Sequence, residues 1–258
     1  MVSLVALISR ESYSQPIVSE GRYYFPANIS QVEACQNAFL DARQAAMSKA
    51  GLERGNFSQM DICSETEKGA SCSLIQINQS YFDGGYILSE EKVSEQIQTE
   101  NDFRECVVTG KFEVKKFSSQ PDLNFLVEAE LNQKNFFSGQ EIKITGETNR
   151  KAHITLLSYD PKTEIISKVV PNDYERTMEI DGEFEIPSRQ NSDEYAINAL
   201  ILESDTRDEV AEFMILLATK NKFDFLSETK ASSFYKRLDE LGRQNWRKIE
   251  LGYTIYRK

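Results

Sequence analysis

The four cysteines constrain the fold more than any other feature, because all of them lie in the first 106 of 258 residues. An even number of cysteines confined to one half of a chain is typical of disulfides formed in an oxidising compartment. Four cysteines allow three pairings, and sequence alone does not decide between them. We favour Cys63–Cys72, which would close a short loop, and Cys35–Cys106, which would close a long one.

Three other roles for the thiols remain open at this stage. A nucleophilic thiol needs an electropositive neighbourhood or a histidine base, and the single histidine, His153, lies in the other half of the chain. A zinc site is disfavoured because none of the spacings gives a C-x2-C or C-x4-C pair. The main alternative is that Cys35 is a plain buried thiol.

Residues 30–51 are predicted to form one helix. Ser30 and Glu33 have the spacing of a capping box, and Gly51 is a natural terminator. One face of the helix is apolar and consists of Cys35, Ala38, Phe39, Ala42, Ala45, Ala46 and Ala50. Because the alanines are small, we expect this helix to lie flat across a sheet.

The N-terminal residues bear on the compartment. Residues 1–9 form a short apolar run, and Ser12 and Ser14 have the spacing of a cleavage site, so residues 1–15 are predicted to be a signal-peptide remnant. An ordinary first strand is the alternative. No other stretch approaches the roughly 20 apolar residues of a membrane span. Together with the cysteines, this predicts an exported protein, periplasmic or associated with the outer membrane.

The chain is predicted to contain two domains of α+β class. Residues 16–117 read as a helix over an antiparallel, disulfide-stapled sheet, and residues 118–122, within "KKFSSQPDL", read as a linker. Residues 123–258 read as a β-sandwich-like domain that ends in a helix at 227–241 and a strand at 248–256. Its seven earlier strands are expected at 123–131, 141–147, 152–160, 164–172, 183–188, 195–204 and 210–218.

The sequence offers no catalytic, cofactor-binding or metal-binding motif, so we expect no enzyme activity and no cofactor. His153 is expected on the surface of a strand, and the acidic run at 201–212 lacks the order of a calcium loop. The aromatic residues Tyr23, Tyr24, Phe25, Phe136 and Phe137 are candidates for a sugar-binding platform, although core packing is the simpler explanation.

The charge is unevenly distributed. The net charge of −11 argues against nucleic acid as a partner, because the phosphate backbone requires neutralisation by Lys and Arg. Residues 230–258 nevertheless hold eight basic and three acidic side chains. We expect this basic tail to lie against its own acidic domain, and a docking surface for an acidic partner is the alternative.

Two resemblances follow from these patterns. Residues 17–117 resemble the N-terminal domain of flagellar assembly protein T, through Gly21, Ala42, Gly51, Gly110 and Val114. The second half resembles a bacterial domain of unknown function that is found in exported and signalling proteins. The positions that carry the second resemblance are Phe137, Gly139, Val170-Pro171-Asn172, Ile186-Pro187, Trp246 and Tyr253.

These resemblances imply a non-catalytic structural or assembly component of the bacterial cell envelope, such as a periplasmic ring or scaffold of a flagellar motor or similar machine. The expected partners are other envelope or motor-complex proteins, with peptidoglycan as a further contact. The alternative is a module that binds cell-wall or surface polysaccharide. An enzyme would require two carboxylates in one cleft with pKa values far apart.

Overall fold

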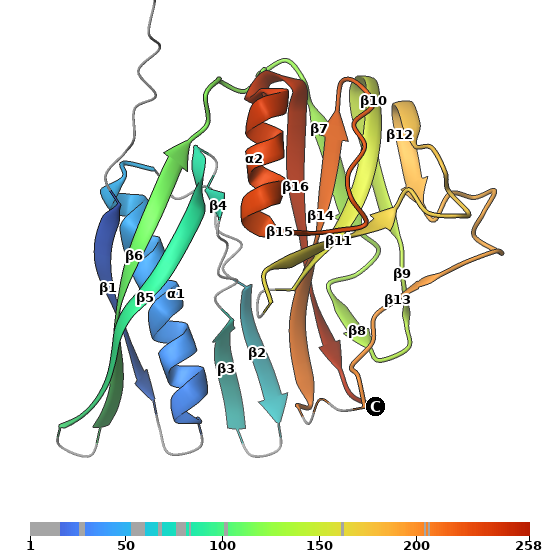
Figure 1. Ribbon diagram of the computed structural model, residues 1–258. Coiled ribbons are helices and arrows are strands. Elements are labelled where there is room, and N and C mark those ends of the chain that lie inside the picture. Colours follow the sequence, from blue (N-terminus) through green and yellow to red (C-terminus); the bar gives the residue numbers. More distant parts are fainter. Residues whose placement is uncertain are drawn as a thin grey trace, which may run out of the picture. The chain divides into compact units, whose positions relative to one another are not determined.

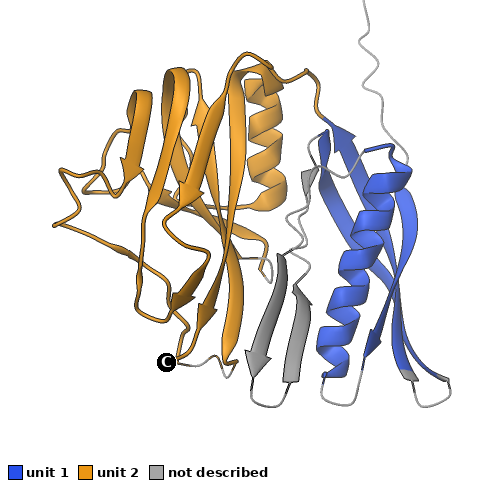
Figure 2. Ribbon diagram, turned by 180° about the vertical axis from the view of Figure 1, so that it is seen from behind, with its two compact units in different colours: residues 1–54, 82–116 blue, residues 55–81, 117–258 orange. Residues whose placement is uncertain are grey.

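The computed structural model describes residues 16–25, 29–52, 60–66, 69–75, 81–82, 84–100, 103–160, 163–203, 205 and 207–258, with only the strands described in 60–82. The predicted signal-peptide remnant, residues 1–15, lies outside the described residues. The chain divides into two compact units (Figure 2): Met1–Arg54 with Phe82–Lys116, and Gly55–Tyr81 with Phe117–Lys258. Strands predominate over helices in the described part, and the fold is mixed α and β.

The first unit is a helix on a sheet, as predicted. Its sheet has the order β1-β6-β5-β4, and β6 pairs antiparallel with both β1 and β5. Helix α1 packs across β1 and β6 (Figure 1). These elements are β1 (Ile17–Phe25), α1 (Gln31–Lys49), β4 (Tyr81–Phe82), β5 (Gly85–Glu100) and β6 (Phe103–Lys116).

The helix begins and ends where the sequence predicted. The Ser30 hydroxyl accepts a hydrogen bond from the Glu33 amide at 3.1 Å, and Gly51 follows the helix with a φ of 70°. Ala38, Ala42 and Ala46 of the apolar face are buried, whereas Ala45 and Ala50 are half-buried. The buried side also includes Arg43, which was not predicted, and its Nε donates to Glu90 Oε2 at 2.5 Å. A buried guanidinium thus has a charged partner on β5.

The second unit contains one large sheet of order β15-β11-β10-β14-β16-β8, with β7 and β12 also paired to β10. Its members are β7 (Val127–Leu131), β8 (Asn135–Phe137), β10 (Ile144–Asp160), β11 (Ile165–Val170), β12 (Glu179–Ile186), β14 (Glu209–Thr219), β15 (Glu228–Lys230) and β16 (Trp246–Tyr256). The remaining elements are α2 (Ala231–Leu241), the short helix η1 (Arg243–Asn245), and two ribbons: β2 (Met60–Thr66) with β3 (Gly69–Ile75), and β9 (Glu141–Ile142) with β13 (Ile197–Asn198).

Strand β10 organises the second unit and corrects the prediction. The sequence suggested strands at 141–147 and 152–160 with a turn between them, whereas Ile144–Asp160 is one continuous strand. Its first part pairs with β7 and β12, and its second part pairs with β11 and β14. The register with β12 shifts between Thr148 and Ala152, so a bulge accommodates the polar residues that looked like a turn. Strand β10 therefore connects the strands on both sides of this irregularity into one hydrogen-bonded sheet.

Other boundaries also differ from the prediction. Of the strand expected at 195–204, Ile197–Asn198 is the part that is a strand among the described residues 195–203. The predicted helix at 227–241 begins at Ala231, because Glu228–Lys230 instead pair with β11. The final strand predicted at 248–256 is confirmed as β16, and it also pairs in parallel with β8. The core lies beneath β10, β14 and β16 and includes Phe136, Leu156, Leu216 and Ile255.

Candidate functional site

The disulfide between Cys35 and Cys106 is confirmed. It joins α1 to the central strand β6, with the two Cα atoms 5.2 Å apart and a sequence separation of 71 residues. Cys35 is 2% exposed and Cys106 is fully buried. Because both sulfur atoms are in a buried disulfide, Cys35 and Cys106 are not nucleophiles, metal ligands or free thiols.

The second predicted pair, Cys63 and Cys72, stays a prediction. The two residues lie opposite each other in the β2–β3 ribbon. Their side chains are outside the described residues. Directly opposed positions on antiparallel strands bring two Cβ atoms within about 5.5 Å, which is close to the separation that a disulfide requires.

His153 lies beside the ion pair that Lys151 of β10 forms with Glu179 of β12. His153 on β10 has its Nε2 3.6 Å from Glu179 Oε2. Lys151 also contacts this carboxylate at 2.7 Å, and its hydrogen bond holds the pKa of Glu179 below the usual range. In the described part of the chain, no three His, Cys, Asp or Glu side chains lie together as metal ligands would.

A shallow depression lies on the three-stranded part of the sheet formed by β7, β10 and β12. Its polar lining is Glu128, Glu130, Thr145, Glu147 and Glu183. Glu128 lies opposite Glu147, which in turn lies opposite Glu183, so three carboxylates form one row across three strands. The row makes this face strongly acidic.

The segment predicted as a linker is attached to the second unit by hydrogen bonds. Both the amide and the hydroxyl of Ser118 donate to Asp239 Oδ1, at 2.8 and 2.9 Å. The hydroxyl of Ser119 accepts from the Arg243 amide at 2.7 Å. Residues 118–122 are therefore part of the second unit, and they are connected to α2 and η1.

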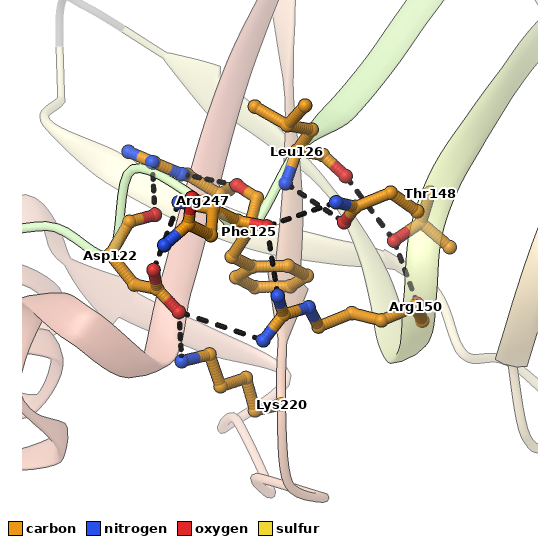
Figure 3. Close-up of polar contacts among 9 residues, drawn as sticks. Asp122, Phe125, Leu126, Thr148, Arg150, Lys220 and Arg247 are labelled. Carbon is orange, nitrogen blue, oxygen red and sulfur yellow. Dashed lines mark hydrogen bonds and ion pairs between the residues drawn. The ribbon is translucent and has the colours of Figure 1, made fainter.

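The next turn, residues 122–126, is held by three cationic side chains (Figure 3). Lys220 Nζ lies 2.6 Å from Asp122 Oδ2, and Arg150 lies 3.6 Å from the same oxygen. Arg247 donates to the Asp122 carbonyl and, at 2.7 Å, to the Phe125 carbonyl. We call residues 122–126 the anchored turn. Its carboxylate and two carbonyls are bonded to Arg150 on β10, to Arg247 on β16 and to Lys220, which directly follows β14. The backbone of this turn therefore has little freedom.

The anchored turn presents apolar side chains to solvent. Leu123 is 75% exposed and Leu126 is 55% exposed. The backbone amide of Leu126 donates to Asn149 Oδ1 at 3.0 Å, and its carbonyl accepts from the Asn149 amide at 3.2 Å. Two leucines are therefore exposed on a segment that is held in one conformation, and sequence analysis had placed no function there.

The predicted aromatic candidates divide into buried and exposed residues. Phe25 and Phe136 belong to the cores, whereas Tyr24 is 66% exposed and Phe137 is 51% exposed. Sequence analysis missed a third aromatic site, where Tyr174 stacks on Tyr195 with ring centroids 5.4 Å apart. The signal that could have found it is the Pro171-Asn172-Asp173 turn, which places the next side chain at the surface.

The basic tail binds its own unit, as expected. Besides the two bonds of Arg247, the guanidinium of Arg257 donates to the Asp205 and Arg207 carbonyls. Arg243 stacks on the ring of Trp246 with its Cζ 3.9 Å from the centroid, and its Nη1 donates to the Trp246 carbonyl at 3.0 Å. Two further tail cations have internal partners as well: Arg237 donates to the Asp224 carbonyl at 3.0 Å, and Lys248 pairs with Glu250.

No protein-family model matches the chain, and no curated protein matches its sequence. The two resemblances drawn from the sequence therefore remain predictions. The described helices include none that is long and apolar enough to cross a membrane.

Proposed function

We propose that this chain is a non-catalytic structural or assembly component of the bacterial cell envelope, acting as a periplasmic ring or scaffold protein of a flagellar motor or a similar machine. The observation that carries the proposal is the buried Cys35–Cys106 disulfide. Disulfides persist in exported proteins and are rare where glutathione and thioredoxin keep thiols reduced. In this proposal the disulfide keeps the first unit rigid within an assembly.

The anchored turn supplies the contact surface in this proposal. Single exposed leucines are ordinary on protein surfaces. Leu123 and Leu126 differ because the turn that carries them is already ordered by Arg150, Lys220 and Arg247. A partner that covers these leucines would therefore lose little conformational entropy on binding.

The proposal also covers the arrangement of the strands in the second unit. We propose that its strands are related to a β-sandwich in which β10 passes from one sheet to the other at the Thr148–Ala152 irregularity. Such a unit exposes strand edges and loops to neighbours in an assembly. The resemblance to a domain of exported and signalling proteins supports this assignment.

Site-specific crosslinking in the native envelope tests the proposal. A photoreactive amino acid is placed at Leu123 of the full chain, and at Leu226, which is 59% exposed, as the control. We expect crosslinks to envelope or motor-complex proteins from position 123 and few from position 226. A chain that stays monomeric in its native extract, with no envelope protein crosslinked or co-purified, would contradict the proposal.

A further inference from the structure

The aromatic pair Tyr174 and Tyr195 presents one open ring face. The two rings lie nearly parallel, with an interplanar angle of 15°. Tyr195 packs against the core of the second unit, and Tyr174 lies on Tyr195 yet is 54% exposed. The stack is offset, so Tyr195 lies against part of one face of the Tyr174 ring and does not contact the opposite face.

The loop that carries Tyr174 is held by its own side chains. Asn172 Oδ1 accepts hydrogen bonds from the amides of Tyr174 and Glu175, at 2.9 and 2.8 Å. Asn172 Nδ2 donates to the Val169 carbonyl at 3.2 Å. This arrangement is an Asx turn, and it fixes the backbone at the point where Tyr174 projects.

A buried carboxylate connects this loop to the loop that carries Tyr195. Glu175 is 4% exposed, and it accepts from the Ser188 amide at 2.6 Å and from the Tyr195 hydroxyl at 2.5 Å. Burial and this bond to Glu175 raise the pKa of Tyr195, so its hydroxyl keeps the donated proton. Both tyrosines are therefore held in place before any ligand arrives.

The surroundings of the open ring are polar. In the loops 171–178 and 187–196, Tyr174 is the large apolar side chain that is exposed. Asp173 and Arg176 flank it and are exposed, as are Asp193 and Glu194 just before Tyr195. A protein-binding hot spot is normally surrounded by further apolar contacts that exclude water, and this ring has none among the described residues of its loops.

We propose that Tyr174 is a stacking platform for a neutral pyranose ring of a polysaccharide. One face of a pyranose is lined with C–H groups and its rim carries hydroxyls, which suits a single flat aromatic surrounded by hydrogen-bonding side chains. The net charge of −11 disfavours an anionic polymer. This inference does not rest on the envelope scaffold proposal, since the leucines of the anchored turn belong to a different segment.

Calorimetric titration of the full chain with chitohexaose, cellohexaose and anionic polygalacturonate tests this platform. We expect at least one neutral oligosaccharide to bind, and polygalacturonate to bind more weakly. Tyr174→Ala should weaken binding by about tenfold or more, which corresponds to about 1.4 kcal/mol. Tyr174→Phe keeps the stacking ring and should stay within about threefold of the wild type.

Tyr24→Ala, which removes another exposed tyrosine, is the matched control and should leave binding unchanged. The thermal midpoint of each variant confirms that it is folded. The inference is overturned if no neutral oligosaccharide binds at millimolar concentration, if Tyr174→Ala binds as tightly as the wild type, or if polygalacturonate binds best.

Discussion

A Cβ atom placed on Gly21 of β1 would lie 2.1 Å from the carbonyl oxygen of Ala38 in α1. It would also lie 2.2 Å from the Ala42 amide nitrogen. The backbone of the helix therefore lies directly on the backbone of the strand, with no room for a side chain between them. The small residues at 21, 38 and 42 allow this approach, and the disulfide joins α1 to β6 nearby.

Gly21→Ala should therefore destabilise the first unit. The methyl group meets backbone atoms on α1, which cannot rotate away as a side chain can, so the helix must shift. We expect a loss of roughly 3 kcal/mol in the free energy of unfolding, at the upper end for overpacking. Urea unfolding followed by far-UV circular dichroism measures it.

Gly84→Ala is the matched control, because the described atom that a Cβ there meets belongs to the end of the Leu52 side chain, at 3.0 Å. It should cost less than about 1 kcal/mol. Equal losses for the two variants would mean that the close approach at Gly21 does not determine stability.

Removal of the Cys35–Cys106 disulfide should lower stability by a comparable amount. Closing a loop with a sequence separation of 71 residues restricts the unfolded chain, and the chain-entropy estimate is about 4 kcal/mol. The double variant Cys35→Ala/Cys106→Ala, unfolded in urea beside the wild type, measures this loss. Reductant should lower the free energy of unfolding of the wild type by breaking this bond. The variant lacks the bond, so reductant should cause no such loss in it.

Intact mass after thiol blocking then tests the second predicted pair. If Cys63 and Cys72 are joined, protein isolated from its native cells takes up no blocking reagent, and Cys35→Ala/Cys106→Ala takes up none either. Uptake of two equivalents by the wild type would show that the β2–β3 pair is not a disulfide.

The ion pair of Asp122 with Lys220 should make part of the folding stability of the second unit sensitive to acid. The hydrogen bond from Lys220 holds the pKa of Asp122 below its ordinary value, so the pair stabilises the folded state above the unfolded-state pKa of about 3.9. This contribution disappears as the pH falls through the folded-state pKa. Asp122→Asn should therefore lose less stability than the wild type between about pH 6 and about pH 2.

Unfolding can be followed by the fluorescence of Trp246, the single tryptophan, which is buried in this unit. Asp224→Asn is the control, since the Asp224 side chain is 91% exposed and should not change the acid dependence. Identical acid dependence for Asp122→Asn and the wild type would refute the assignment.

Two side chains of α1 should protect the edge strand β1 from pairing with another chain. Lys49 Nζ donates to the Val18 carbonyl at 3.0 Å, and Asp41 Oδ2 accepts from the Arg22 amide at 3.1 Å. An edge strand with free amides and carbonyls is a template for association. Asp41→Ala/Lys49→Ala should therefore self-associate at concentrations where the wild type does not.

Sedimentation velocity measures this association. Gln31→Ala/Gln36→Ala, which changes two exposed residues of the same helix, is the control and should behave as the wild type. If both double variants sediment like the wild type, Lys49 and Asp41 do not protect the edge.

The elements that the sequence predicted well are those that depend on residues close together in the chain. The cap at Ser30, the glycine at 51 and the alternation along β16 each act within a few residues. Strand β10 was divided in error because "ETNRK" resembles a turn, whereas Asn149 bonds to Asn124 and Leu126, 25 and 23 residues away. The anchored turn depends on Arg247, which is 125 residues from Asp122. The position of Tyr174 depends on the ring of Tyr195, which is in another loop. Local patterns do not contain these distant partners.

The disulfide also determines what happens when a protease cuts the chain. It closes residues 35–106 into a ring, and that ring includes the β2–β3 ribbon, which groups with the second unit. A protease that cuts once within the ring would release nothing, because both products stay joined through the two sulfur atoms. Such a nicked molecule would migrate as one band in electrophoresis without reductant and as two bands with it, so the protein can survive a cut that would sever an open chain.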